Sequence, residues 1–91
     1  MTVTIRVPQT LRAYSGGAPE LASEAPTVGA ALDQLGQEHP RLYLNICDET
    51  GAVRRHLNIF VNSSHMRDRQ GLATELMPGD VITILPAVSG G

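Results

Sequence analysis

The five residues Val81-Ile82-Thr83-Ile84-Leu85 constrain the fold more than any other stretch of this chain. They are apolar at nearly every position and follow Pro78-Gly79-Asp80, a typical turn sequence, so they predict a short final strand. A strand with one solvated face alternates apolar and polar residues, whereas a strand covered on both faces is apolar almost throughout. We therefore expect the last strand to lie at the centre of a sheet, buried on both faces.

Alternating side chains indicate two further strands. Residues 2–7 alternate polar and apolar positions up to Pro8, and residues 56–62 show the same alternation. In the second segment one face carries Leu57, Ile59 and Val61, and the other carries Asn58 and Phe60. A period of two places every second side chain on the same side of a sheet, so each strand offers one apolar face to a core.

One amphipathic helix is predicted between these strands. Thr27 is a suitable N-cap residue, and Pro40 disfavours helical geometry in the residue before it, so the helix should end near Glu38-His39. Apolar residues recur at helical spacing within these limits, at Val28, Ala31, Leu32 and Leu35. This stripe covers one side of the helix and should face the sheet.

The other segments carry weaker signals. Residues 11–26 contain two adjacent glycines and two prolines, which predict a mobile loop. Residues 41–46 fit either a short helical turn or a strand, residues 62–65 a turn, and residues 67–76 an irregular stretch. The order of elements predicts an α+β domain over residues 1–86, with a small mixed sheet packed on one main helix, and a flexible tail over residues 87–91.

Composition argues against two classes of partner. The net charge is −2, and the chain has one phenylalanine, two tyrosines and no tryptophan, which disfavours a nucleic-acid surface. No apolar run approaches the roughly 18 residues that span a bilayer, and no secretory segment is recognisable. We expect a cytoplasmic protein without nucleic-acid or membrane partners.

Side chains for catalysis or metal binding do not cluster in the sequence. His39, His56 and His65 share no ligand spacing and are expected to be solvated. Cys47 is the only cysteine, which excludes an internal disulfide and is typical of a small, half-buried apolar position. Asp48-Glu49 is expected to be a solvated turn. We predict no bound metal or cofactor, and a chain this poor in catalytic groups is more readily a substrate or a binding module than an enzyme.

The chain ends in Gly90-Gly91. Glycine has no Cβ, so such a terminus is slim and its α-carboxylate is unobstructed. Pro86 stiffens the exit from the final strand, and residues 86–91 extend on the order of 20 Å when straight. The pattern indicates a carboxylate that can enter the narrow active site of another enzyme.

The C-terminal third resembles the MoaD/ThiS family of ubiquitin-like sulfur carriers. The resemblance is carried by residues 57–62, Gly71-Leu72-Ala73-Thr74, Pro78-Gly79-Asp80 and residues 81–91, and it extends over nearly the whole chain, weakly in residues 11–26. Ser89 stands where such tails usually have alanine. Within the family, Leu85-Pro86-Ala87-Val88 is most similar to the carriers of cysteine biosynthesis. The resemblance implies a β-grasp fold.

The resemblance also implies a chemistry for the tail. An adenylyltransferase/sulfurtransferase of the ubiquitin-activating type would use ATP to adenylate the Gly91 carboxylate, with Gly90 beside it in the channel. A sulfur nucleophile would displace AMP and leave a thiocarboxylate on Gly91, for use by a cysteine-synthase-like or other biosynthetic enzyme. A metalloprotease that trims a cysteine adduct is a further partner. Docking is expected to involve Phe60, unless it is a core residue, together with Leu85, Pro86, Ala87, Val88 and Ser89.

Three other functions remain open at this point. The small subunit of molybdopterin synthase uses the same fold and tail. A protein modifier would be conjugated through Gly91 to lysines of target proteins, although this chain has no lysine and so cannot form chains on itself. A plain interaction domain would have no use for Gly90-Gly91.

Overall fold

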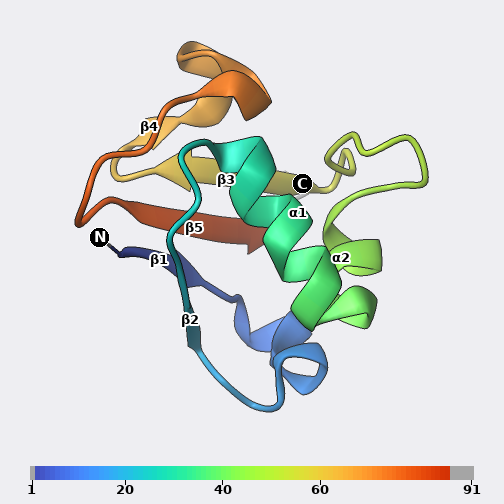
Figure 1. Ribbon diagram of the computed structural model, residues 1–91. Helices are drawn as coiled ribbons and strands as arrows, with labels where there is room; N and C mark the ends of the chain where they lie inside the picture. Colours follow the sequence, from blue (N-terminus) through green and yellow to red (C-terminus); the bar gives the residue numbers. More distant parts are fainter. Residues whose placement is uncertain (1, 87–91) are drawn as a thin grey trace.

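A computed structural model describes residues 2–86 as a five-stranded mixed sheet with two helices on one face (Figure 1). The strand order across the sheet is β2-β1-β5-β3-β4. The elements are β1 (Val3–Arg6), β2 (Glu20–Ser23), α1 (Val28–Glu38), α2 (Pro40–Ile46), β3 (Leu57–Val61), β4 (Ser64–His65) and β5 (Val81–Pro86). The expected α+β architecture is confirmed.

The last strand lies at the centre of the sheet, as the sequence predicted. β5 pairs in parallel with β1, from Thr4 opposite Val81 to Arg6 opposite Thr83. On its other side it pairs antiparallel with β3, from Leu57 opposite Pro86 to Val61 opposite Ile82. β5 therefore joins the N-terminal hairpin of β1 and β2 to the hairpin of β3 and β4.

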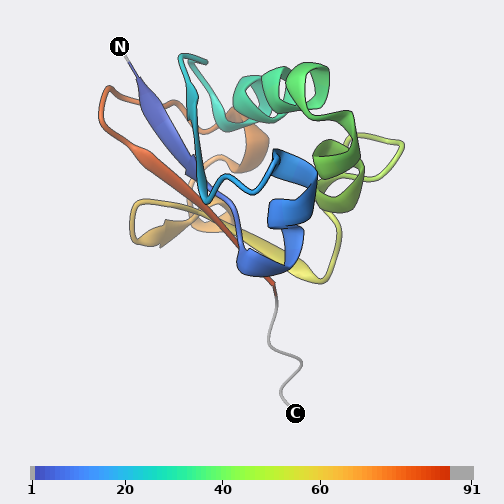
Figure 2. The same cartoon turned by 90° about the horizontal axis from the view of Figure 1, so that it is seen from below.

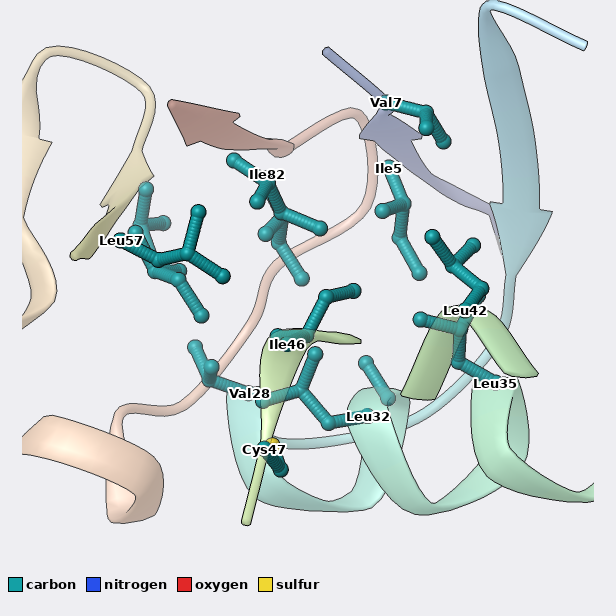
Figure 3. Close-up of a cluster of buried hydrophobic side chains, with 14 residues drawn as sticks. Ile5, Val7, Val28, Leu32, Leu35, Leu42, Ile46, Cys47, Leu57 and Ile82 are labelled. Atoms are coloured by element: carbon teal, nitrogen blue, oxygen red, sulfur yellow. The ribbon is translucent and has the colours of Figure 1, made fainter. Parts of the chain in front are cut away.

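One face of the sheet packs against the two helices to form the core (Figure 3). Alternate strand residues point into it, and the apolar stripe of α1 meets them, as predicted. Thr27 caps α1, since its side chain accepts a hydrogen bond from the Ala30 N–H over 3.1 Å. The fully buried side chains at the centre are Ile5, Val28, Leu32, Leu42, Ile46, Ile59, Ile82 and Ile84.

The expectation that the final strand is buried on both faces is wrong. Ile82 and Ile84 are buried, but Val81 and Thr83 are only half-buried and Leu85 is exposed. The physical reason is that both helices lie on the same face of the sheet, so that no element of residues 2–86 covers the other. Val81 and Leu85 are apolar although they point away from the core, so β5 departs from the usual alternation of apolar inward and polar outward residues.

One other sequence-based prediction is wrong, and one open alternative is decided. Residues 11–26 are not a loop throughout, because they contain the end of a 3-10 helix (Gln9–Ser15) and the edge strand β2. Residues 40–46 form a second helix, which decides between the two alternatives for that segment. Pro40 occupies the first turn of α2, where its missing N–H costs nothing, so it ends α1 and begins α2.

A polar pair fixes the end of β3 against the start of β5. The Asn62 amide donates to Asp80 Oδ1 over 3.0 Å, and its oxygen accepts from the Val81 N–H over 3.0 Å. Asp80 Oδ2 accepts from the Met77 N–H over 2.8 Å. Asn62 has a φ of 55°, a left-handed conformation that asparagine tolerates better than most residues. These donors, the Met77 N–H first, hold the pKa of Asp80 below its ordinary value.

We predict that Asp80→Asn lowers Tm at neutral pH and that the difference from the wild type vanishes in acid. Asp80 accepts these hydrogen bonds best when ionised, so its contribution is complete above its ordinary pKa of about 3.9 and is lost as the pH falls through the lowered pKa. Thermal melts at pH values from about 7 to about 2 measure the difference. Asp68→Asn, at an exposed carboxylate, is the matched control. A gap that widens in acid would contradict this role.

Candidate functional site

The sheet face opposite the helices, here called the outer face, carries a continuous row of side chains. Directly paired residues point to the same side of a sheet. The pairings therefore place one residue from each strand in a single row across all five strands, His65, Phe60, Thr83, Arg6 and Glu20. Aromatic groups stand at one end of this row and charged groups at the other.

The aromatic end is held by side-chain contacts. The rings of Phe60 and His65 meet edge to face, with centroids 5.1 Å apart. His65 Nδ1 accepts from the Arg67 N–H over 3.0 Å, so the neutral ring carries its proton on Nε2 and donates it to Asn58 Oδ1, 3.0 Å away. The sequence predicted a solvated turn at His65, but this residue belongs to β4 and is half-buried. A two-residue strand is too short for its alternation to be recognised.

Phe60 lies on the outer face, away from the core residues of β3, in the orientation that the sequence predicted. It is half-buried, between the core and exposed alternatives. Leu85 is 44% exposed and pairs with Asn58, so it is a diagonal neighbour of Phe60 on the outer face. The two apolar groups are held on rigid strands close to the point where β5 ends.

The end of β5 borders a groove of about 440 Å³, here called the tail-exit groove. Figure 2 shows β5 ending beside the 3-10 helix Gln9–Ser15, whose first residues form the opposite wall. The walls are mostly apolar, and two arginines stand among them. The lining residues that matter most are Arg6, Pro8, Arg12, Leu85 and Pro86. Of the tail residues predicted to be functional, Ala87, Val88, Ser89, Gly90 and Gly91 lie outside the described residues.

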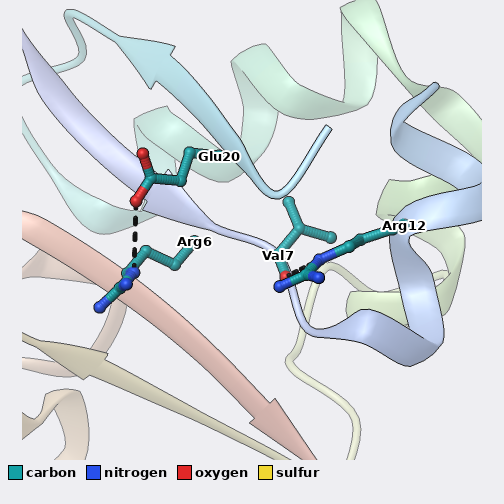
Figure 4. Close-up of polar contacts among 4 residues, drawn as sticks. All are labelled: Arg6, Val7, Arg12 and Glu20. Carbon is teal, nitrogen blue, oxygen red and sulfur yellow. Dashed lines mark hydrogen bonds and ion pairs between the residues drawn. The ribbon is translucent and has the colours of Figure 1, made fainter. Parts of the chain in front are cut away.

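The two arginines of the groove differ in how they are held (Figure 4). Arg12 Nε donates to the Val7 carbonyl over 3.1 Å, which fixes its guanidinium over the end of β1. Arg6 Nε lies 3.4 Å from Glu20 Oε2, and both of these side chains are more than half exposed. An exposed ion pair of this kind contributes little to stability.

Cys47 is buried rather than half-buried as expected. Its side chain is 1% exposed, because the residue closes α2 and forms a bridge with Val53 against the core. Burial is the main cause that raises the pKa of its thiol to about 11, so the thiolate is scarce at neutral pH. Residues 2–86 contain no group of three or more histidine, cysteine, aspartate or glutamate side chains placed to hold a metal ion. No helix in this part of the chain is long and apolar enough to cross a membrane.

Comparison with known proteins places this geometry in a family. The profile of the ThiS family matches residues 5–91. The sulfur carrier protein CysO of Mycobacterium tuberculosis strain H37Rv is 37% identical over 93 residues, covering 100% of both chains. The crystal structure of Mycobacterium tuberculosis CysO superposes with a TM-score of 0.87 at 35% identity, over 94% of this chain and 99% of that one. The expected β-grasp fold is confirmed.

Two further relatives differ in their described roles. The structure of a BexX/CysO complex from Amycolatopsis orientalis contains a chain that is 34% identical, with a TM-score of 0.87 over 98% of this chain and 99% of that one. Small archaeal modifier protein 3 of Haloferax volcanii is 34% identical over 65 residues, 71% of this chain and 70% of the relative.

Stability measurements can separate the outer face from the core on a single strand. We predict that Phe60→Ala lowers the free energy of unfolding by about 1–2 kcal/mol, because the ring is only partly removed from water. Ile59→Ala, at the adjacent and fully buried position, should cost about 2–5 kcal/mol. Urea unfolding of both variants gives the two values. An equal or larger loss for Phe60→Ala would place its ring in the core.

Proposed function

The chain belongs to the ThiS family, and from this premise we propose that it is a sulfur carrier protein with Gly91 as the carrier group. In this proposal Gly91 receives sulfur as a thiocarboxylate and donates it to the biosynthesis of cysteine or of another sulfur-containing metabolite. The observation that carries the proposal is the match to CysO along the full chain, together with a C-terminal Gly-Gly that is separated by three residues from the end of the central strand at Pro86.

The chemistry consists of activation followed by substitution. A partner enzyme joins the Gly91 carboxylate to the AMP part of ATP and releases pyrophosphate. A persulfide sulfur then attacks the acyl carbon and expels AMP, and a thiol cleaves the resulting acyl disulfide to leave the thiocarboxylate. The carrier supplies placement to these steps. Its carboxylate belongs to the second of two residues without side chains, five positions after Pro86, where the central strand ends in its pairing with β3.

In this proposal the protein is a co-substrate of its partners and not a catalyst. It is consumed in one reaction and regenerated in another. Its one thiol is buried with a raised pKa, which suits a structural position better than a catalytic one. ATP would be bound by the activating partner and not by this chain. We propose that the protein acts in the cytoplasm, where ATP is available.

We propose that partners dock on the outer face next to the end of β5. Phe60 and Leu85 offer an apolar contact there, and Pro86, the last residue of β5, precedes the further proposed contact residues Ala87, Val88 and Ser89. Apolar groups on paired strands near the last residue of β5 are suited to a partner that must hold the domain while it acts on the last glycine. The domain thus spans residues 1–86 and the tail residues 87–91 in this proposal.

The proposed partners are an activating adenylyltransferase/sulfurtransferase and a sulfur-accepting biosynthetic enzyme. The complex of an Amycolatopsis orientalis CysO with BexX supports the general idea that a domain of this shape docks onto a second protein. The match to CysO supports a cysteine-synthase-like acceptor over the large subunit of molybdopterin synthase. A metalloprotease that removes a cysteine adduct completes this set of partners.

A second candidate function is conjugation to other proteins. It is favoured by the similarity to a small archaeal modifier protein over 71% of this chain. The same activated Gly91 would then be attacked by a lysine amine, and not by sulfur. The two functions diverge only after adenylation, so the fate of the acyl group decides between them.

We predict that deleting Gly91 abolishes the exchange of pyrophosphate into ATP by the activating enzyme encoded in the same genome, and leaves Tm unchanged. Without Gly91 the terminal carboxylate is one residue closer to the domain and no longer reaches the reacting position in the enzyme. Tm stays the same because the core residues all lie between positions 3 and 84. Exchange assays and thermal melts of both proteins measure the two effects.

The matched control is Ser63→Ala, a substitution at an exposed residue of the β3–β4 turn. This variant should retain full exchange. Undiminished exchange without Gly91 would contradict the role of the terminus, and a large fall in Tm would show that the last residue is part of the folded domain.

A further inference from the structure

The tail-exit groove is positively charged in a protein whose net charge is negative. Two of the seven arginines, Arg6 and Arg12, line it, and no carboxylate side chain of residues 2–86 does. The chain carries nine acidic residues against these seven arginines, which gives the net charge of −2. The net negative charge of the molecule repels an acidic partner, whereas the two arginines attract it at this groove. This distribution of charge directs an acidic partner to the groove.

Arg12 is prepared to bind a carboxylate before any partner arrives. Its Nε is held by the Val7 carbonyl at 3.1 Å, which orients the guanidinium plane. No carboxylate of residues 2–86 lies within ion-pair distance of it. A guanidinium fixed in this way loses less side-chain freedom when it pairs with a carboxylate than a free arginine does.

Arg6 can exchange its partner at low cost. Its contact with Glu20 is made in solvent, with side chains that are 60% and 53% exposed. Water and salt weaken such a pair, so an incoming carboxylate competes with Glu20 on nearly equal terms. The two arginines thus offer two carboxylate positions on neighbouring parts of one groove.

The walls between these positions are apolar and adjoin the tail. Leu85 is 44% exposed, and Pro8 and Pro86 complete the surface around it. Pro86 lines the groove and is the last residue of β5, five positions before Gly91. Five residues span at most about 18 Å, so an enzyme that acts on Gly91 lies close enough to contact the groove as well.

We propose that the tail-exit groove binds an acidic segment of the protein that activates Gly91. Carboxylates of this segment pair with Arg12 and Arg6, and an apolar side chain between them packs on Leu85 and Pro86. This inference rests on the proposed function, because it assumes that a partner acts on the terminus. It adds a charge-based recognition site to the apolar docking around Phe60.

The test is the kinetics of activation for the charge-reversed variant Arg12→Glu, with the activating enzyme encoded in the same genome. We expect KM for the carrier to rise on the order of tenfold with kcat unchanged, since the contact holds the complex without touching the reacting atoms. The difference should shrink as ionic strength rises, because salt screens exposed charges. Arg41→Glu makes the same charge change at an exposed position of α2 outside the groove and should leave KM unchanged.

Folding and function are separated by two additional measurements. Arg12→Gln removes the charge without reversing it and should give an intermediate KM, while thermal melts establish that each variant is folded at the assay temperature. A wild-type KM for folded Arg12→Glu, or an equal rise for Arg41→Glu, overturns the groove proposal and leaves the sulfur-carrier proposal intact. If the wild-type chain is not activated at all by an enzyme active on its own substrate, the proposed function itself fails.

Discussion

The pairing of β5 with both of its neighbours is the interaction on which the rest of the structure depends. β5 is the only connection in the sheet between the β1–β2 hairpin and the β3–β4 hairpin, within residues 2–86. Its inward residues, Ile82 and Ile84, are fully buried against the helices. Without this strand the two hairpins would not form one sheet, and α1 and α2 would have no continuous surface to cover.

The same strand joins the fold to its proposed chemistry. β5 is paired with β1 as far as Thr83 and with β3 as far as Pro86, so its last residue has a defined place at the end of the central strand. The helices cover only one face, which leaves Phe60 and Leu85 on the other, close to this exit. Arg12, from the 3-10 helix Gln9–Ser15, lines the wall of the tail-exit groove opposite the end of β5. A partner can therefore bind the folded surface while it acts on the terminal glycines. This arrangement suits a carrier that must be recognised by more than one enzyme.

The sequence predicted the parts of this arrangement that depend on local pattern. The cap at Thr27 and the central place of the last strand were found, because capping and apolar runs have strong local signals. The strand β2 was missed, because its four residues, Glu20–Ser23, show no clear alternation. Arg12 was not recognised as a site residue, since its position in the groove depends on a contact with Val7 and on the distant end of β5. Only the three-dimensional fold brings those segments together.

The chemical state of the Gly91 carboxylate is the most direct test of the proposed carrier role. The measurement is the intact mass of the protein after incubation with ATP, a sulfur source and the activating enzyme, followed by fragmentation to locate any change. We predict a mass gain that corresponds to the replacement of one carboxylate oxygen by sulfur, located at Gly91. An unchanged mass, with an enzyme that is active on its own substrate, would contradict the carrier role and reduce Gly90-Gly91 to an ordinary chain end.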